Sequence, residues 1–358
     1  MARSATASID LTALRHNLRQ VRNMAPNSNV IAVVKADGYG HGIVDVARSL
    51  SAADLLGVAC IEEALQLREA GITTDILLLE GFFEDSELTL IERYNLQSVI
   101  HQHVQLDQIC QHSFKQPPSV WIKLDTGMNR LGFEPEQFPA IYRQLQQSGT
   151  VVSIRAMTHL ACSDELNNPL TLQQYQTLKS VTNDADIELS VAASAAVIGW
   201  PQTHEQWVRP GLMLYGVSPF LNKTGADHQL RAAMLFQSKI ISIKQVKQGD
   251  TVGYGASWVA GRDSRIGVIA AGYGDGYPRH APSGTPVLID GQRASLVGRV
   301  SMDMICVDLT DMPNTKLGDT ATLWGAELPI EEIAKRCDAI PYQLLCGLTQ
   351  RVAITYKN

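Results

Sequence analysis

The chain has 358 residues, 45% hydrophobic and 18% charged, which is typical of an ordinary soluble globular protein of roughly two domains. Its formal net charge of -6 argues against nucleic acid as the main partner. The N-terminal MARSATASIDLTALRHNLRQ has no continuous apolar stretch, and no run approaches a membrane span, so we expect neither a secretory signal nor a membrane partner. The six cysteines form no CxxC pair and no metal-like pairing with histidine, so we expect reduced thiols, no bound metal and a cytoplasmic protein.

In chain order, the first predicted element is a helix over residues 10–25, with Asp10 as its N-cap. Apolar, β-branched runs of strand length then alternate with segments of helical spacing. These runs are continuous rather than strictly alternating, which is typical of strands buried on both faces of a parallel sheet. The eight predicted strands cover residues 30–36, 55–60, 75–81, 96–101, 120–126, 152–160, 188–194 and 207–216.

Eight such units predict a closed (β/α)8 (TIM) barrel, with an open doubly wound sheet as the alternative. After about residue 230 the helical patterns mostly disappear and short strands with turn signals replace them. Asp290-Gly291 lies between two of these strands and predicts a tight hairpin turn, and a short helix is expected at 329–337. We therefore predict an α/β protein in which a barrel, residues 1–232, precedes a mostly β domain, residues 233–358. Residues 1–9 are a weak candidate for a strand of the second domain.

Lys35 follows an apolar run and precedes a glycine-rich loop in VIAVVKADGYGHG, residues 30–42. An apolar setting favours the neutral amine of a lysine, which is a nucleophile for carbonyl compounds such as the aldehyde of pyridoxal phosphate (PLP). Glycines in the loop let the backbone approach a bulky ligand closely. Considered alone, the segment fits equally well a lysine that extends from a strand end into water.

Active sites of such barrels lie at the carboxyl ends of the strands, with phosphate often bound after strands seven and eight. Here Ser194, which ends strand seven, supplies a hydroxyl, and Gly211, on strand eight, allows a backbone N–H to face a phosphate. A nucleophilic lysine and a phosphate site at one barrel end suit PLP. Taken singly, each candidate has an ordinary alternative, such as a surface arginine, a core histidine or a helix cap. The other candidates at this end are Tyr39, Arg130, His159, Arg209 and Leu212.

Six segments occur in one order along the chain: AVVKADGYGHG, LDTGMNRLGF, RPGLMLYG, VGYGASW, AGYGDGYPR and GRVSMDMICVD. Together they resemble the alanine racemases, which are fold-type III PLP enzymes, and the resemblance runs nearly from end to end. It implies interconversion of L- and D-alanine, with D-alanine serving peptidoglycan synthesis or alanine catabolism. It also implies a homodimer with shared active sites, in which the second domain of one subunit completes the barrel site of the other.

The resemblance implies a role for each matching position. Lys35 would hold PLP covalently and Tyr254 would be the base on the opposite face of the substrate. Arg130 would contact the substrate carboxylate or the phenolic oxygen of the cofactor, and Met302 and Asp303 would complete the substrate pocket. The cofactor would be bound by Tyr39, His159, Ser194, Arg209, Gly211, Leu212 and Tyr342. Lys123 matches a lysine that is carbamylated in some members. One departure is Ala193, where many members have asparagine.

Three rival activities stay open at this point. They are racemisation of another amino acid such as serine, a fold-type III decarboxylase that would use Cys346, and a PLP carrier without catalysis. Carriers of that type lack a second domain. We also hypothesise a hydrogen-bonded chain Tyr254–His159–Arg209 that lowers the pKa of the tyrosine, because a free tyrosine is almost wholly protonated at neutral pH.

Overall fold

The computed structural model describes residues 5–358. Contacts between Cα atoms divide the chain into two compact units. The barrel unit consists of Leu14–Leu214 and Ser218–Leu221, and the β unit consists of residues 5–13, Tyr215–Val217 and Asn222–Asn358. The domain boundary proposed after residue 232 stays a prediction.

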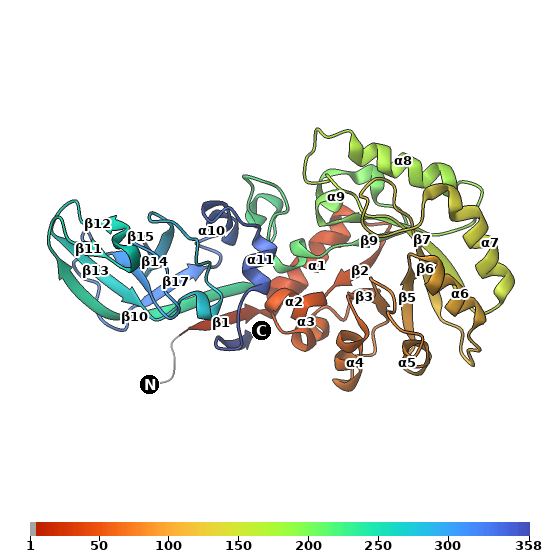
Figure 1. Cartoon of the computed structure of the whole chain (residues 1–358), viewed down its shortest axis with the longest axis horizontal. Helices are drawn as coiled ribbons and strands as arrows, with labels where there is room; N and C mark the ends of the chain where they lie inside the picture. Colours follow the sequence, from red (N-terminus) through yellow and green to blue (C-terminus); the bar gives the residue numbers. More distant parts are fainter. Residues whose placement is uncertain (1–4) are drawn as a thin grey trace. The chain divides into compact units, whose positions relative to one another are not determined.

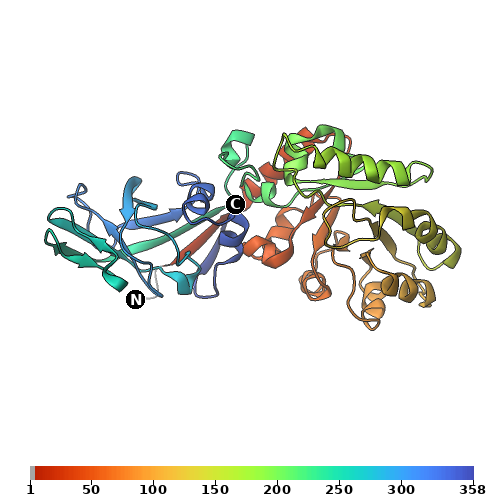
Figure 2. The same cartoon turned by 45° about the horizontal axis from the view of Figure 1, so that its top comes forward.

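The barrel unit is a closed ring of parallel strands in chain order, in which β9 returns to pair with β2. The prediction of eight strands and closure is confirmed, and the open sheet is excluded (Figures 1 and 2). Each strand is shorter than the apolar run that predicted it. The strands are β2 (Asn29–Val33), β3 (Leu55–Val58), β4 (Ile76–Leu78), β5 (Leu96–Ile100), β6 (Ser119–Lys123), β7 (Ser153–Met157), β8 (Leu189–Ala193) and β9 (Trp207–Arg209).

Side chains from most of these strands fill the barrel interior, which is therefore a packed core. The indole rings of Trp121 and Trp207 meet edge to face with centroids 5.5 Å apart, and the Arg155 guanidinium lies over both rings. Arg155 is in turn paired with Glu188 at 2.6 Å. Because side chains fill the interior, a ligand cannot bind inside the barrel. A site is therefore expected at the carboxyl ends of the strands. The buried cluster consists of Ile31, Leu55, Leu77, Val99, Trp121, Met157 and Trp207.

Helices cover the outside of the barrel strands (Figures 1 and 2). The predicted N-cap is confirmed, because Asp10 Oδ1 accepts hydrogen bonds from the backbone N–H groups of Thr12 at 2.7 Å and Ala13 at 3.0 Å. The helices are α1 (Leu11–Met24), α2 (Lys35–Gly40), α3 (Ile43–Ser49), α4 (Ile61–Glu69), α5 (Glu87–Arg93), α6 (His103–Gln111), α7 (Phe138–Ser148), α8 (Leu170–Thr182) and α9 (Ser194–Gly199).

Two predicted strand ends are wrong. The eighth strand ends at Arg209, because Pro210 has no N–H for the strand ladder, and Leu212–Tyr215 form a 3-10 turn instead of strand. The first strand ends at Val33, so Lys35 begins a separate turn rather than ending the strand. Both changes place candidate site residues on loops at the carboxyl end of the barrel.

The β unit is a sheet in the order β13-β16-β15-β14-β17-β10-β1-β18, in which β13 also pairs with β10 and so closes part of the sheet on itself. Asp290 and Gly291 join β14 to β15 with φ angles of 44° and 82°, which confirms the predicted hairpin turn. The predicted helix at 329–337 is α10 (Ile330–Arg336), while α11 (Pro341–Cys346), β17 and β18 were not predicted. The long strand β10 is drawn in teal in Figure 1. The strands are β1 (Thr6–Asp10), β10 (Met234–Val246), β11 (Thr251–Val252), β12 (Trp258–Val259), β13 (Ser264–Ile269), β14 (Pro286–Ile289), β15 (Gln292–Leu296), β16 (Ile305–Asp308), β17 (Thr320–Trp324) and β18 (Ala353–Lys357).

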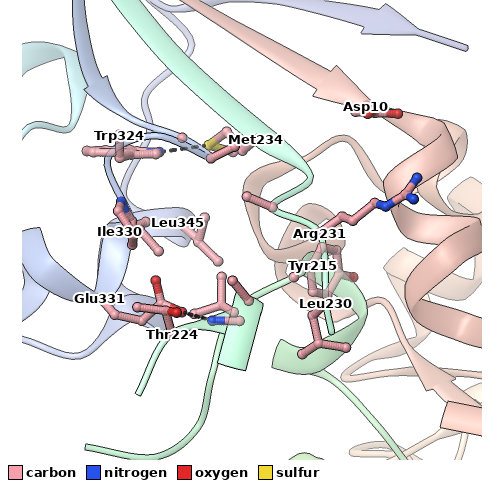
Figure 3. Close-up of a pocket in the computed structure, with 18 residues that line it drawn as sticks. Asp10, Tyr215, Thr224, Leu230, Arg231, Met234, Trp324, Ile330, Glu331 and Leu345 are labelled. Atoms are coloured by element: carbon pink, nitrogen blue, oxygen red, sulfur yellow. Dashed lines mark hydrogen bonds between the residues drawn. The ribbon is translucent and has the colours of Figure 1, made fainter. Parts of the chain in front are cut away.

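Strand β1 belongs to this sheet, between β10 and β18. Of the weakly predicted strand at residues 1–9, positions 1–4 lie outside the described residues. The β unit also holds a cavity of about 320 Å³ beside Trp324, Met234 and Arg231 (Figure 3). The described residues that line this cavity include none of the predicted site residues. Among helices in the described part of the chain, none is long and apolar enough to cross a membrane.

Candidate active site

Lys35 begins an unusual left-handed turn at the carboxyl end of β2. Ala36, Asp37 and Tyr39 have φ angles of 53°, and Gly38 has a φ of 59°. Left-handed helical backbone costs an L-residue roughly 1–2 kcal/mol, so a run of four such residues, three of them non-glycine, needs support from its surroundings. Strain of this kind is concentrated at functional sites, which singles out the Lys35 loop.

Hydrogen bonds from flanking elements hold this turn in place. The Glu63 carboxylate of α4 accepts from the N–H of Ala36 at 2.7 Å and from the N–H of Ala59 at 2.8 Å. Asp37 Oδ1 accepts from the N–H of Ile43 at 2.8 Å, at the start of α3. Below the turn, the fully buried His41 donates from Nδ1 to the Tyr39 carbonyl at 2.8 Å, and burial lowers its pKa to about 4. The loop backbone is therefore fixed close to the reactive lysine.

The Lys35 ammonium lies 3.7 Å from Glu80 Oε1, a residue that follows β4. Both side chains are about 40% exposed, so the pair adds little to stability. Other cations influence the same region, since Arg209, Arg130 and Lys35 all act electrostatically on Lys123. Such a concentration of positive charge suits a substrate or cofactor with several negative groups.

Lys123, at the end of β6, is buried near this cationic cluster. Burial, and after it the charges of Arg209 and Arg130, together lower the pKa of its ammonium to about 8. A substantial fraction of Lys123 is therefore neutral amine at mildly alkaline pH.

Arg130 lies at the end of a loop that Asp125 organises. Asp125 Oδ1 accepts from three successive backbone N–H groups, those of Gly127, Met128 and Asn129, at 2.9–3.0 Å, and Oδ2 accepts from the N–H of Arg130 at 2.8 Å. Burial alone raises the pKa of Asp125, but these N–H donors outweigh it and the pKa is lowered. The ionised carboxylate thus determines the course of the loop that presents Arg130.

Arg209 and His159 form a second group at the barrel end. Arg209 donates from Nη1 to the Ser190 carbonyl at 2.8 Å and from Nη2 to the Thr158 carbonyl at 2.7 Å. Its Nη2 also lies 3.4 Å from Nδ1 of His159. Burial lowers the pKa of His159 to about 3, and the Arg209 and Arg130 charges act in the same direction, so the imidazole is neutral. Two of the three residues of the hypothesised chain are therefore adjacent.

Ser194, Gly211 and Tyr39 converge at the ends of β8, β9 and β2. The buried Ser194 Oγ accepts from the N–H of Gly211 at 2.9 Å and from the N–H of Met213 at 3.3 Å. A Cβ on Gly211 would lie 2.5 Å from the Tyr39 hydroxyl oxygen, so only glycine fits there. A hydroxyl, a phenol and two backbone N–H groups are donors of the kind that a phosphate group needs.

The other predicted site residues belong to the β unit, which is described separately from the barrel unit. Tyr254 and Met302 are 72% and 52% exposed, which is high for large apolar side chains. Asp303 is paired with Arg351 at 2.5 Å. Tyr342 lies on α11 and is 36% exposed.

Sequence analysis missed Glu80 and Asp125, although both are at strand ends. The signal for Asp125 was present, because an aspartate before Thr-Gly is typical of a turn that its side chain caps. Glu80 had no comparable signal: its approach to Lys35 depends on β2 and β4 lying on either side of β3 in the closed barrel.

Comparison with known families agrees with this arrangement. Residues 9–219 match the model for the alanine racemase N-terminal domain, and residues 233–356 match the model for the alanine racemase C-terminal domain. The chain belongs to the alanine racemase family. An alanine racemase of Vibrio parahaemolyticus is 48% identical over 357 residues, which are 99% of this chain and 100% of that protein.

Solved structures of the alanine racemase family share the fold throughout. The biosynthetic alanine racemase of Pseudomonas aeruginosa superposes with a TM-score of 0.97 at 44% identity, covering 99% of this chain and 100% of that one. The alanine racemase of Bartonella henselae, solved with covalently bound pyridoxal phosphate, has a TM-score of 0.90 at 27% identity and covers 99% of both chains.

Proposed function

We propose that this member of the alanine racemase family is an amino-acid racemase that interconverts L- and D-alanine with PLP as its cofactor. One observation supports this most strongly. Lys35, the Arg209–His159 pair and the Ser194–Gly211–Tyr39 group all lie at the carboxyl end of one barrel. A covalent anchor, a partner for a pyridine ring and a phosphate site are the three attachments that PLP requires.

The residues fit PLP in their donor chemistry. Ser194, Tyr39 and the N–H of Gly211 would hold the phosphate, and Tyr342 would join them. Among the described hydrogen bonds of Arg209, those from Nη1 and Nη2 go to neutral oxygen and nitrogen acceptors, and Nε takes part in none, so Nε–H would donate to the pyridine nitrogen. Gly211 lets the backbone come close to that end of the ligand.

When bound, PLP withdraws electrons from the substrate Cα and so acidifies its proton. The chain must then take that proton from one face and return one to the other. The Lys35 amine would exchange the proton of the D-enantiomer, and the Tyr254 phenol that of the L-enantiomer. Two bases avoid moving one group across the substrate plane. Arg130 would bind the substrate carboxylate, with Met302 and Asp303 limiting the space for its side chain and so favouring alanine over serine.

We further propose that Tyr254, Met302 and Asp303 act in the barrel site of a second copy of this chain. Their exposure supports this: aromatic and thioether side chains that are more than half exposed are typical of a surface that another protein covers. In such a homodimer each active site combines Lys35 of one subunit with Tyr254 of the other.

The activity is tested by incubating the purified protein and PLP with L-alanine or D-alanine alone and following the optical rotation. We expect both solutions to approach the same racemic mixture. Borohydride should fix PLP to Lys35, and the Lys35→Ala variant should retain no borohydride-fixed cofactor. Optically unchanged L-alanine despite full cofactor loading would refute the function. A panel of other amino acids that includes serine tests for racemisation of a different substrate. Released CO2 would indicate a decarboxylase.

The shared site is tested by complementation. Co-expressed Lys35→Ala and Tyr254→Phe subunits form heterodimers in which one site carries both substitutions and the other carries neither, if the residues act across subunits. We expect such heterodimers to regain up to about half of the wild-type activity per dimer. If Lys35 and Tyr254 act within one subunit, both sites carry one substitution and no activity returns.

A further inference from the structure

The segment AGYGDGYPR, residues 271–279, was interpreted from sequence as an ordinary aromatic turn, but it is tightly bonded to the loop of Met302 and Asp303. The N–H of Tyr273 donates to the Ser301 carbonyl at 3.1 Å, and the N–H of Gly274 donates to the Met302 carbonyl at 2.9 Å. A Cβ on Gly272 would lie 2.5 Å from the Met302 carbonyl oxygen. The two loops therefore touch backbone to backbone, which only glycine permits at that position.

Asp275 is the buried centre of this arrangement. Its side chain is fully buried, and its Oδ2 accepts from the N–H of Gly272 at 2.9 Å. Its Oδ1 lies 3.5 Å from Nε of Arg351. A buried carboxylate needs both hydrogen bonds and a counter-charge, so Asp275 fixes the position of the arginine as well as the turn.

Arg351 connects this buried carboxylate to Asp303. Its Nη2 donates to Asp303 Oδ1 at 2.5 Å, while its Nε faces Asp275. Thr349 ties the same C-terminal segment to the turn, because its hydroxyl donates to the Gly274 carbonyl at 2.8 Å. A Cβ on Gly274 would overlap the Arg351 guanidinium, so the arginine packs directly against the turn.

The contacts of Tyr273, Gly274 and Arg351 fix the shape of the loop that presents Met302 and Asp303. Ser301 closes it, since its hydroxyl donates to the Met304 carbonyl at 2.9 Å and accepts from the Met304 N–H at 3.1 Å. With Arg351 attached, the Asp303 carboxylate is both oriented and neutralised. Without Arg351, Asp303 would lose this counter-charge in a pocket that receives a carboxylate substrate.

We infer that Asp275 and Arg351 are positioning residues, which act through Asp303 on the binding of the alanine carboxylate. The inference rests on the proposed function, in which Met302 and Asp303 line the substrate pocket. Its distinctive consequence is that the harm done by losing Arg351 arises mainly from the charge of Asp303.

The test compares the holoenzyme variants Arg351→Met, Arg351→Lys, Asp303→Asn and the double variant Arg351→Met/Asp303→Asn. Arg351→Met should raise the KM for alanine by about 10- to 100-fold with a smaller change in kcat, since misplacement of a binding group costs that order. Adding Asp303→Asn should reverse most of that rise, and Arg351→Lys should retain part of the function. The inhibition constant of propionate, which has the alanine carboxylate but no amine, should follow the same pattern.

Arg293→Met is the matched control, because Arg293 forms a comparable ion pair with Glu332 at 2.7 Å on another exposed face of the β unit. We expect it to leave KM unchanged. Bound PLP absorbance and the unfolding midpoint identify a variant that fails to fold. If Arg351→Met fails to fold, the KM values of Arg351→Lys and Asp303→Asn test the inference instead. An unchanged KM in a folded Arg351 variant, or a KM rise that persists in the double variant, would overturn the inference. A wild-type protein that does not racemise alanine would overturn the proposed function first, and this inference with it.

Discussion

Nη2 of Arg209 lies 3.4 Å from Nδ1 of His159 at the carboxyl end of the barrel. The arginine remains charged, because burial lowers its pKa only to about 10, whereas the pKa of the imidazole falls to about 3. His159 is therefore a neutral group held by a permanent cation. It can transmit the influence of Arg209 to a phenol without itself gaining charge at neutral pH.

The first prediction concerns the pH dependence of the rate. If the chain Tyr254–His159–Arg209 lowers the pKa of the catalytic phenol, replacing His159 by leucine should move the acidic limb of the pH–rate profile, where the base loses its proton, to higher pH. The profile should be measured for L-alanine, since Tyr254 is the base proposed for that enantiomer. A profile of unchanged shape in a folded, PLP-loaded variant would show that the chain is wrong.

The second prediction concerns reaction specificity. Arginine can donate a hydrogen bond to the pyridine nitrogen without protonating it, whereas a carboxylic acid would protonate it. Arg209→Glu should therefore draw more carbanion charge into the ring and raise transamination relative to racemisation. Pyruvate formation per racemisation event measures the ratio. An equal ratio in wild type and variant would count against this role for Arg209.

The third prediction concerns the stability contributed by Lys123. Its pKa is about 8 in the folded protein and near 10.5 when unfolded, so between these values the unfolded chain binds a proton that the folded one lacks. The free energy of unfolding should therefore rise with pH across this window, by up to about 3 kcal/mol. Urea unfolding at successive pH values measures it, and Lys123→Met should flatten the rise.

Bicarbonate supplies the control for Lys123. A neutral amine can react with CO2 to form a carbamate, which would replace the ammonium in the folded protein. The alkaline rise should then shrink in bicarbonate-saturated buffer for wild type and stay flat for Lys123→Met. An identical slope in wild type and Lys123→Met in bicarbonate-free buffer would contradict the assignment of the titration to Lys123.

The fourth prediction concerns the phosphate site. Gly211→Ala would place a methyl carbon 2.5 Å from the Tyr39 hydroxyl and displace one of the proposed phosphate ligands. We expect the affinity for PLP to fall by about 10- to 100-fold, as the loss of one hydrogen bond to a charged group implies. Gly261→Ala is the control, since its Cβ would meet nothing within 4 Å. Equal PLP dissociation constants for the two variants would refute the proposed site.

The fifth prediction concerns Tyr254, which is proposed to act on one face of the substrate only. Tyr254→Phe should lower the rate by about 10² to 10⁴, the usual effect of one acid–base group. The loss should fall mainly on proton removal from L-alanine, so the Cα-deuterium isotope effect should grow in that direction. Isotope effects that are equal in both directions before and after the substitution would contradict the assignment of faces.

The sequence by itself determined the architecture, because its main signals are local. Continuous apolar runs recurring eight times predict parallel strands, and eight of them close a barrel. Asp10 caps its helix and Asp290-Gly291 forms its hairpin through contacts within a few residues, so both were predictable. The family membership follows from six short segments, each recognisable without coordinates.

Only the tertiary structure decided how the site is held. The left-handed turn after Lys35 depends on Glu63 and His41, whose bonds no local propensity indicates. Glu80 approaches Lys35 only because β2, β3 and β4 are adjacent in the barrel. Asp275, Asp303 and Arg351 come from three separate segments. Their interaction energies depend on distance in space and on burial, which a linear pattern of residues does not contain.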